Sequence, residues 1–230
     1  MGIKGKLIIG FSLLLVIIVS ITFLGIRGVQ QANQKHVHVQ NYLSYRHANL
    51  NALYIEVLYA RRLSSQIVLH TGDIDELSQI ESEITVIRTR IGRLIDNITQ
   101  NVRNDPWIHM ETARFYEEII HDLDWRIQRY FFEILEPLYE LAMSDYDNDL
   151  LLYDLMAREV WHYNWINSVI NELIISTEWA IMALNDEIFF SARNATMIML
   201  LVSSIGIIIG GVVAVLIGIT VTKAVKDKQQ

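Results

Sequence analysis

Two adjacent arginines, Arg61 and Arg62, are the first residues whose type and spacing suggest chemistry. They lie among Tyr54, Tyr59 and Ser64. Because a guanidinium group donates two parallel hydrogen bonds to a carboxylate or phosphate, an arginine pair that faces a groove predicts a site for an anion or an amino acid. The alternative is a pair of solvated arginines in surface ion pairs with acidic neighbours.

Glu159 and His162 are a second candidate pair, because the apolar spacing around them places both on core positions. Buried polar side chains need partners. At a rise of 1.5 Å per residue, Arg61 and His162 lie ~50 Å and ~48 Å along their helices from the apolar segments described below. Arg126 and Arg129 are expected at the same level. We therefore expect an arginine layer facing Glu159 and His162, either as a buried ionic network, which the pairing of buried charges favours, or as a ligand site.

Two Glu-x-x-His motifs, at Glu118 to His121 and at Glu159 to His162, suggest a di-iron centre or a metal sensor as a further alternative. Their spacing argues against it, since the two motifs would be offset by ~13 Å along a pair of antiparallel helices. We therefore expect no metal, no cofactor and no catalytic residue, and we find no nucleophile–base set or phosphate-binding loop. The absence of cysteine excludes thiolate metal sites, disulfides and cysteine nucleophiles.

The composition indicates long helices that include membrane segments. Of the 230 residues, 52% are hydrophobic and 20% are charged, with 2 prolines and 11 glycines. Residues 7–26 and 195–222 contain no charged side chain, and each is long enough to cross a bilayer core of ~20 helical residues. The first is too long for a signal-peptide core, so we expect an uncleaved anchor. A net charge of −7 gives no support to nucleic-acid binding.

The charges beside these two segments predict the topology. Lysines precede the first segment and follow the second, so the positive-inside rule places residues 1–6 and 223–230 in the cytoplasm. Residues 27–194 then form an extracytoplasmic domain. This domain holds 14 Lys and Arg residues against 25 Asp and Glu residues, a formal charge of −11.

The extracytoplasmic segment is predicted to form four helices in an up-down-up-down bundle. The first continues from the membrane to about residue 70. The second has a heptad seam that consists of Leu77, Ile80, Ile84, Ile87, Ile91, Leu94 and Ile98. Its start is predicted by Gly72 and by Asp73 as N-cap, with Glu76 at the third helical position.

The third helix is predicted to open at Asn104, Asp105 and Pro106, where a cap precedes a proline at the first helical position. Its apolar residues continue through Ile134 and Leu138 to Leu141. Pro137 interrupts this pattern and is expected to kink or end the helix. A polar turn at residues 144–149 should precede the fourth helix, which leads into the second apolar segment.

Several apolar side chains lie outside the seams. The tryptophans Trp125, Trp161, Trp165 and Trp179 are interpreted as core residues. A second apolar strip on the first helix predicts a homodimer, because it needs another surface to cover it. Its members are Val37, Val39, Tyr42, Tyr45 and Leu58.

The chain resembles bacterial methyl-accepting chemotaxis receptors with a periplasmic four-helix-bundle sensor domain. The resemblance rests on the N-terminal pattern Lys4-x-Lys6-Leu7-x-x-Gly10-Phe11, on the closing pattern Gly25-Ile26-x-Gly28, and on the layout of the remaining helices. It implies a dimeric receptor of the inner membrane with a ligand site on the outer bundle. Sensor histidine kinases and cyclic-dinucleotide enzymes share this sensor module. Ile219 to Lys223 resembles the first half of the opening of a HAMP linker, but the proline that usually follows is missing.

These observations predict a chemosensory receptor that binds a small ligand outside the cell and moves its second membrane helix. The arginine pair favours an anionic ligand. The eight residues after Thr222 leave no room for an output domain. We therefore expect either the sensor portion of a longer protein, with downstream signalling proteins as partners, or a stand-alone sensor that acts through a partner receptor. The rival interpretation is a structural or adaptor membrane protein whose bundle packs against another bundle. An enzyme is the third and weakest interpretation.

Overall fold

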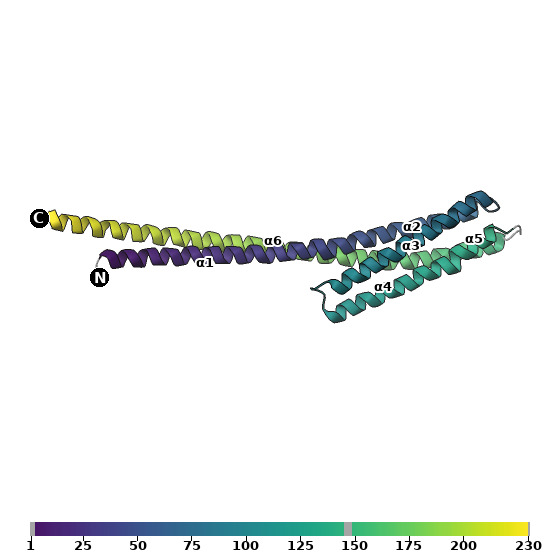
Figure 1. Cartoon of the computed structure of the whole chain (residues 1–230), viewed down its shortest axis with the longest axis horizontal. Coiled ribbons are helices and arrows are strands. Elements are labelled where there is room, and N and C mark those ends of the chain that lie inside the picture. The colour runs from purple at the N-terminus through teal and green to yellow at the C-terminus, as the bar shows by residue number, and fades with distance from the viewer. Residues whose placement is uncertain (1–2, 145–148, 230) are drawn as a thin grey trace. The chain divides into compact units, whose positions relative to one another are not determined.

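Every regular element in the described part of the chain is a helix, which confirms the all-α prediction. The computed structural model describes residues 3–144 and 149–229, with side chains at 9–12, 14–144, 150–219 and 222. In chain order the elements are α1 (Ile3–His38), the π-helical η1 (Val39–Ser44), α2 (Tyr45–Leu69), α3 (Ile74–Asn104), α4 (Met110–Tyr130), the π-helical η2 (Phe131–Leu135), α5 (Glu136–Ala142) and α6 (Asp149–Gln229). Figure 1 labels the α-helices.

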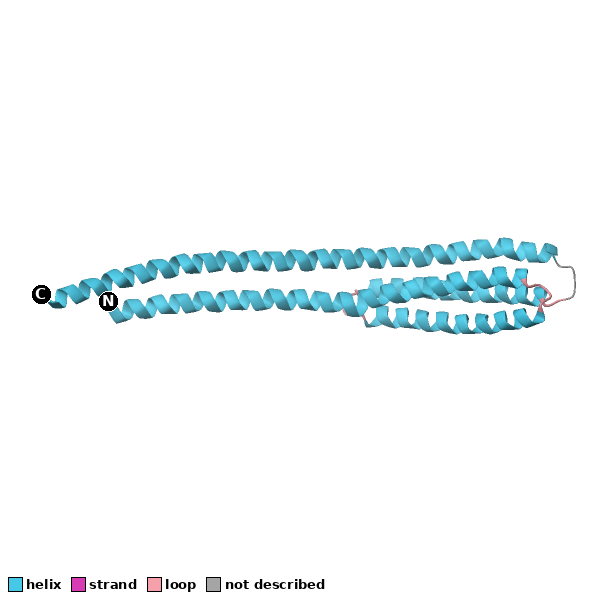
Figure 2. Cartoon of the chain, turned by 90° about the horizontal axis from the view of Figure 1, so that it is seen from above, coloured by secondary structure: helices cyan, strands magenta, loops and turns pink. Residues whose placement is uncertain are grey.

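The chain divides into two compact units, and α6 contributes residues to both. The paired-helix unit consists of Met1–His38 and Ala183–Gln230. Within it, α1 and the C-terminal part of α6 run side by side, with both chain ends at the same end of the pair (Figures 1 and 2). The core unit is Val39–Met182.

Each of the two long helical stretches is long and apolar enough to cross a membrane. Their apolar side chains are largely exposed, including Phe11 and Phe23 on α1 and Leu201 and Ile208 on α6. Water solvates such a surface poorly. This agrees with the prediction of two membrane segments at the level of length and composition.

One hydrophobic cluster joins the helices of the core unit. α2 packs against α3 and α5, and α3 packs against α4. Side chains of α6, among them Ile166 and Ile170, belong to the same cluster. The seam predicted on α3 is buried, with one change: Ile95 is buried and Leu94 is half-buried.

The turn between α2 and α3 has the predicted geometry. Gly72 adopts a φ of 84°, a conformation that favours glycine. Asp73 Oδ1 accepts a hydrogen bond from the Glu76 N–H at 3.2 Å, and Asp73 is therefore the N-cap of α3. The Gly72 N–H donates to the Ala142 carbonyl at 3.0 Å, which ties this turn to the end of α5.

The predicted start of the third helix is wrong. α3 extends through Asn104, and α4 begins only at Met110. Asp105 does not cap α4, because its carboxylate accepts hydrogen bonds from the buried Arg46 at 2.9 Å and from the Trp107 N–H at 3.0 Å. These bonds hold the connector between α3 and α4.

Pro137 does not end its helix, because the π-helical η2 precedes it and α5 continues to Ala142. A π-turn contains one extra residue, so it shifts the core-facing positions after it by one. Ala142 is therefore buried, while the predicted Leu141 is only half-buried. The same extra residue rearranges the hydrogen bonding that a proline would otherwise disrupt.

Two further expectations fall partly outside the description. Residues 145–148 of the predicted polar turn, and the side chains of the lysines beside the apolar segments, lie outside the described residues.

The first predicted helix exists as α1, η1 and α2, with an unpredicted π-segment in it. Val39 is buried in this segment and so does not belong to the exposed strip, in which Val37, Tyr45 and Leu58 remain exposed.

Candidate functional site

The six predicted site residues lie on three helices of the core unit: Arg61 and Arg62 on α2, Arg126 and Arg129 on α4, and Glu159 and His162 on α6. The structure brings together only part of this set.

Glu159 is buried in the core, with 1% of its surface exposed. Arg61 Nε lies 3.5 Å from Glu159 Oε1, and the Tyr130 hydroxyl donates to the same oxygen at 3.1 Å. Burial raises the pKa of Glu159, and the Arg61 charge and the Tyr130 hydrogen bond oppose this rise. Burial and the Glu159 charge raise the pKa of Tyr130 well above its ordinary value, so this phenol keeps its proton at neutral pH.

Arg61 itself is only partly enclosed, with 39% of its side chain exposed. Its guanidinium carbon lies 4.1 Å from the centre of the Tyr163 ring. The arginine therefore extends from the buried carboxylate of α6 to the surface of α2.

His162 is paired with a different carboxylate. Its Nε2 lies 3.8 Å from Glu133 Oε2, and burial lowers the pKa of the imidazole, which leaves it mainly neutral at pH 7. Arg129 donates two hydrogen bonds to Glu133, at 2.7 and 2.8 Å, and this lowers the pKa of Glu133.

Arg126 is also occupied on its own helix. Its Nε donates to Asp122 at 3.2 Å, and its guanidinium carbon lies 3.7 Å from the centre of the Trp165 ring. Arg126 and Arg129 thus contact carboxylates four residues away on the same helical run. Of the arginine layer expected to face Glu159 and His162, Arg61 alone forms an ion pair with Glu159. Arg129 and Arg126 lie near His162 instead, where their charges add to the effect of burial in lowering the pKa of the imidazole.

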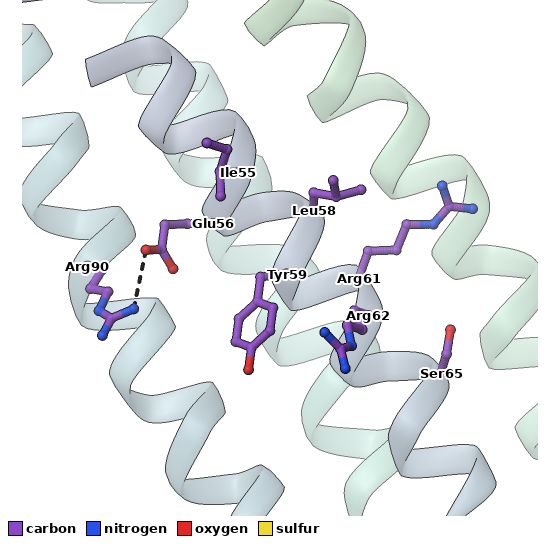
Figure 3. Close-up of a pocket in the computed structure, with 8 residues that line it drawn as sticks. All are labelled: Ile55, Glu56, Leu58, Tyr59, Arg61, Arg62, Ser65 and Arg90. Atoms are coloured by element: carbon purple, nitrogen blue, oxygen red, sulfur yellow. Dashed lines mark hydrogen bonds and ion pairs between the residues drawn. The ribbon is translucent and has the colours of Figure 1, made fainter. Parts of the chain in front are cut away.

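A surface groove of about 680 Å³ lies where α2 meets α3, and both Arg61 and Arg62 line it. Figure 3 shows its eight lining residues, which are Ile55, Glu56, Leu58, Tyr59, Arg61, Arg62, Ser65 and Arg90. The lining carries three arginines and one glutamate. Glu56 accepts a hydrogen bond from Arg90 at 3.4 Å. The groove is therefore a cationic patch on a segment with a strongly negative formal charge.

Arg61 and Arg62 leave α2 in different directions (Figure 3). Arg62 has no carboxylate within ion-pair distance among the described residues, and its guanidinium carbon lies 5.9 Å from the Tyr59 ring centre. Sequence reasoning missed Arg90. Its position on α3 beside the seam residue Ile91 is the signal that could have placed it next to α2.

Comparison of the chain with protein-family models, with curated proteins and with solved structures gives no significant match. The resemblance to chemotaxis receptors therefore stays a prediction.

The tryptophans correct another expectation. Trp125, Trp161 and Trp179 are exposed, and only Trp165 is half-buried. Trp165 lines a second groove, of about 430 Å³, between α4 and α6. Glu118 of the first Glu-x-x-His motif lines this groove together with Glu172. Glu118 thus lies at the level of Glu172, well along α6 from Glu159, in keeping with the offset expected from helix geometry.

Proposed function

We propose that this chain is a membrane-anchored receptor whose four-helix bundle lies outside the cytoplasm and senses a small anionic ligand, in the manner of chemotaxis receptors. In this proposal the chain is a homodimer in a bacterial inner membrane, with both termini in the cytoplasm. The two helices that can cross a membrane and the basic residues beside the apolar segments support this arrangement.

The position of Arg61 is the single observation that carries the proposal. Arg61 is a lining residue of the groove between α2 and α3, while its guanidinium extends away from Arg90 and pairs with the buried Glu159 of α6 (Figure 3). The helix that holds Glu159 also holds the second apolar segment.

This geometry suggests how binding is transmitted. An anion in the groove competes with Glu159 for the Arg61 guanidinium. When Arg61 turns toward the ligand, the Glu159 carboxylate loses its cation in a place where a lone charge is costly. α6 then shifts or Glu159 takes up a proton, and either event couples the groove to α6.

Binding is tested with succinate and inorganic phosphate as probes, on the full chain in lipid nanodiscs by titration calorimetry. Arg62→Ala is the clean variant, because Arg62 takes no part in the Glu159 ion pair. We expect it to weaken binding ~10–100-fold, the loss of one charge-assisted contact. Arg93→Ala is the matched control, since Arg93 is exposed on α3 and does not line the groove. Equal affinity in the parent, Arg62→Ala and Arg93→Ala would remove the anion site.

Coupling is tested with Glu159→Gln, which keeps an acceptor for Tyr130 and frees Arg61. We expect succinate to bind at least as tightly as in the parent, whereas its effect on α6 disappears. The readout is the rate of disulfide formation between Gly28→Cys and Ala195→Cys, whose side-chain positions are adjacent in the paired-helix unit. An unchanged ligand effect on this rate in Glu159→Gln would contradict the coupling.

The exposed tryptophans favour one second candidate, an adaptor that packs against a partner bundle. Trp161 and Trp179 of α6 are large apolar side chains in contact with solvent. Saturable succinate or phosphate binding that depends on Arg62 supports the receptor over the adaptor. A receptor of this kind is equally compatible with a chemotaxis, histidine kinase or cyclic-dinucleotide output.

A further inference from the structure

The groove between α4 and α6 has a lining of opposite charge to that of the groove between α2 and α3. Three aromatic side chains, Phe115, Tyr116 and Trp165, line it together with three acidic ones, Glu118, Asp122 and Glu172. Three aliphatic side chains and the hydroxyl-bearing Ser176 complete the lining. Its volume of about 430 Å³ lies in the range of small-molecule sites.

One of the three carboxylates already shows the kind of contact that this groove favours. Asp122 accepts a hydrogen bond from Arg126 at 3.2 Å, and the same guanidinium stacks 3.7 Å from the Trp165 ring centre. The Arg126 cation, which is not itself a lining residue, is thus held between a carboxylate and an indole ring that both line the groove.

The other two carboxylates have no such cation. Glu118 comes from α4 and Glu172 from α6, and neither forms an ion pair with another described residue. Two negative charges on the same groove repel each other and attract a cation from solution. The formal charge of −11 over residues 27–194 adds to this attraction.

We infer that the groove between α4 and α6 binds an organic ammonium cation, which pairs with Glu118 and Glu172 and packs its alkyl groups against Trp165, Tyr116 and Phe115. Aromatic rings with carboxylates are the surroundings in which proteins hold alkylammonium groups. A metal ion fits less well, because within the described residues no three His, Cys, Asp or Glu side chains form a group that could hold one. This inference does not depend on the proposed receptor function, since it concerns a different groove and a ligand of opposite charge.

The test titrates the full chain in nanodiscs with choline and with 1,5-diaminopentane, at constant ionic strength in sodium chloride. Binding is followed by calorimetry and by tryptophan fluorescence. 3,3-Dimethylbutanol, the uncharged analogue of choline, is the ligand control. Two variants are compared with the parent. One is a double variant that carries Glu118→Gln and Glu172→Gln, and the other is Trp165→Leu. Glu140→Gln is the matched control, because Glu140 is an exposed glutamate of α5 outside the groove.

We expect saturable binding of at least one ammonium compound, at least tenfold tighter than that of 3,3-dimethylbutanol. The double glutamate variant should weaken it at least tenfold and Trp165→Leu several-fold, while Glu140→Gln changes it less than twofold. Tighter binding of choline identifies a single ammonium group as the ligand chemistry, and tighter binding of the diamine identifies two. Absence of saturable binding, or equal weakening in Glu140→Gln, overturns the inference. Loss of succinate binding in Arg62→Ala leaves it intact, so the two proposals fail separately.

Discussion

The carboxyl group of Glu159 is buried, with one cation and one phenol as partners. Burial raises its pKa in spite of both partners, so the folded state binds this proton more tightly than the unfolded state does. By linkage, the contribution of Glu159 to stability is largest below the unfolded pKa of about 4.3 and is lost as the pH rises through the folded pKa.

Glu159→Gln should therefore remove the part of the pH dependence of folding stability that comes from Glu159. We expect its free energy of unfolding to exceed that of the parent by on the order of 1 kcal/mol at pH 8, and the difference to shrink toward pH 4. Urea unfolding followed by circular dichroism at several pH values measures this. Arg61→Ala is the opposite case, because it leaves Glu159 without its cation, and it should lower stability by about 1–3 kcal/mol at pH 8. A difference between parent and Glu159→Gln that does not vary with pH contradicts this account.

The burial of Glu159 and His162 could be predicted from the sequence, because heptad spacing fixes which side of a helix faces the core. Their partners could not be predicted from spacing between helices alone. Arg126 and Arg129 each have a carboxylate four residues away, Asp122 and Glu133, and such pairs form on a helix surface without any tertiary contact. That local competition, visible in the sequence, kept both arginines away from Glu159.

At the scale of elements, alanine substitutions at two glycines, one just before α3 and one inside it, should have opposite effects on stability. Gly72 has a φ of 84° in the turn before α3, whereas Gly92 lies inside α3 with nothing within 4 Å of an added Cβ. We expect Gly72→Ala to destabilise the core unit by about 1 kcal/mol through left-handed backbone strain. Gly92→Ala should stabilise it by ~0.5–1 kcal/mol, because alanine favours the helix. Thermal unfolding of both variants measures this, and a shift of the same sign in both would contradict the assignment.

The π-helical η2 makes a second prediction at this scale. Deleting Phe132 removes one residue and would return the run to a regular α-helix, with Tyr130, Leu135, Leu138 and Ala142 in one continuous seam. Since Pro137 fits poorly inside a regular helix, the deletion is combined with Pro137→Ala. We expect this double variant to fold with a stability within about 1–2 kcal/mol of Pro137→Ala alone.

The matched control is deletion of His121, which is exposed in a regular part of α4. It turns the side chains that follow it by about 100° relative to those before it, and it should abolish cooperative unfolding. Circular dichroism and urea titration compare the two deletions. If both are tolerated, or neither is, η2 does not act as a one-residue insertion.

The helices themselves were predictable because their apolar periodicity is long and regular, as on α3. The π-segments were not, since one extra residue changes the phase of a seam without altering composition. The start of α4 was missed because Asp105 followed by Pro106 fits a helix start equally well. A tertiary partner, the buried Arg46, uses that aspartate instead. The orientation of Arg61 depends on packing against Tyr163, a contact between distant parts of the sequence.

At the scale of the whole molecule, the exposed apolar side chains of α2 predict association of two copies. The chain contains no cysteine, so single cysteines can be introduced without background. We expect Tyr45→Cys and Leu58→Cys, which are exposed positions, to form disulfide-linked dimers in membranes upon mild oxidation. Leu53→Cys, which is fully buried, is the control and should remain monomeric. If none of the exposed positions forms a cross-link, the predicted homodimer is contradicted.

The glycines of the paired-helix unit bear on how its two helices can slide past each other. Side chains of one helix sit against glycines of the other at several levels, with Val213 against Gly10, Met199 against Gly25 and Ile17 against Gly206. A glycine leaves a notch on a helix surface, and a side chain seated in it must be lifted out before the helices can slide. Displacement of α6 along α1 should then proceed in discrete steps between seated positions, and not as a gradual drift. Spin labels on the two helices would report this as a few sharp distances in place of one broad distribution.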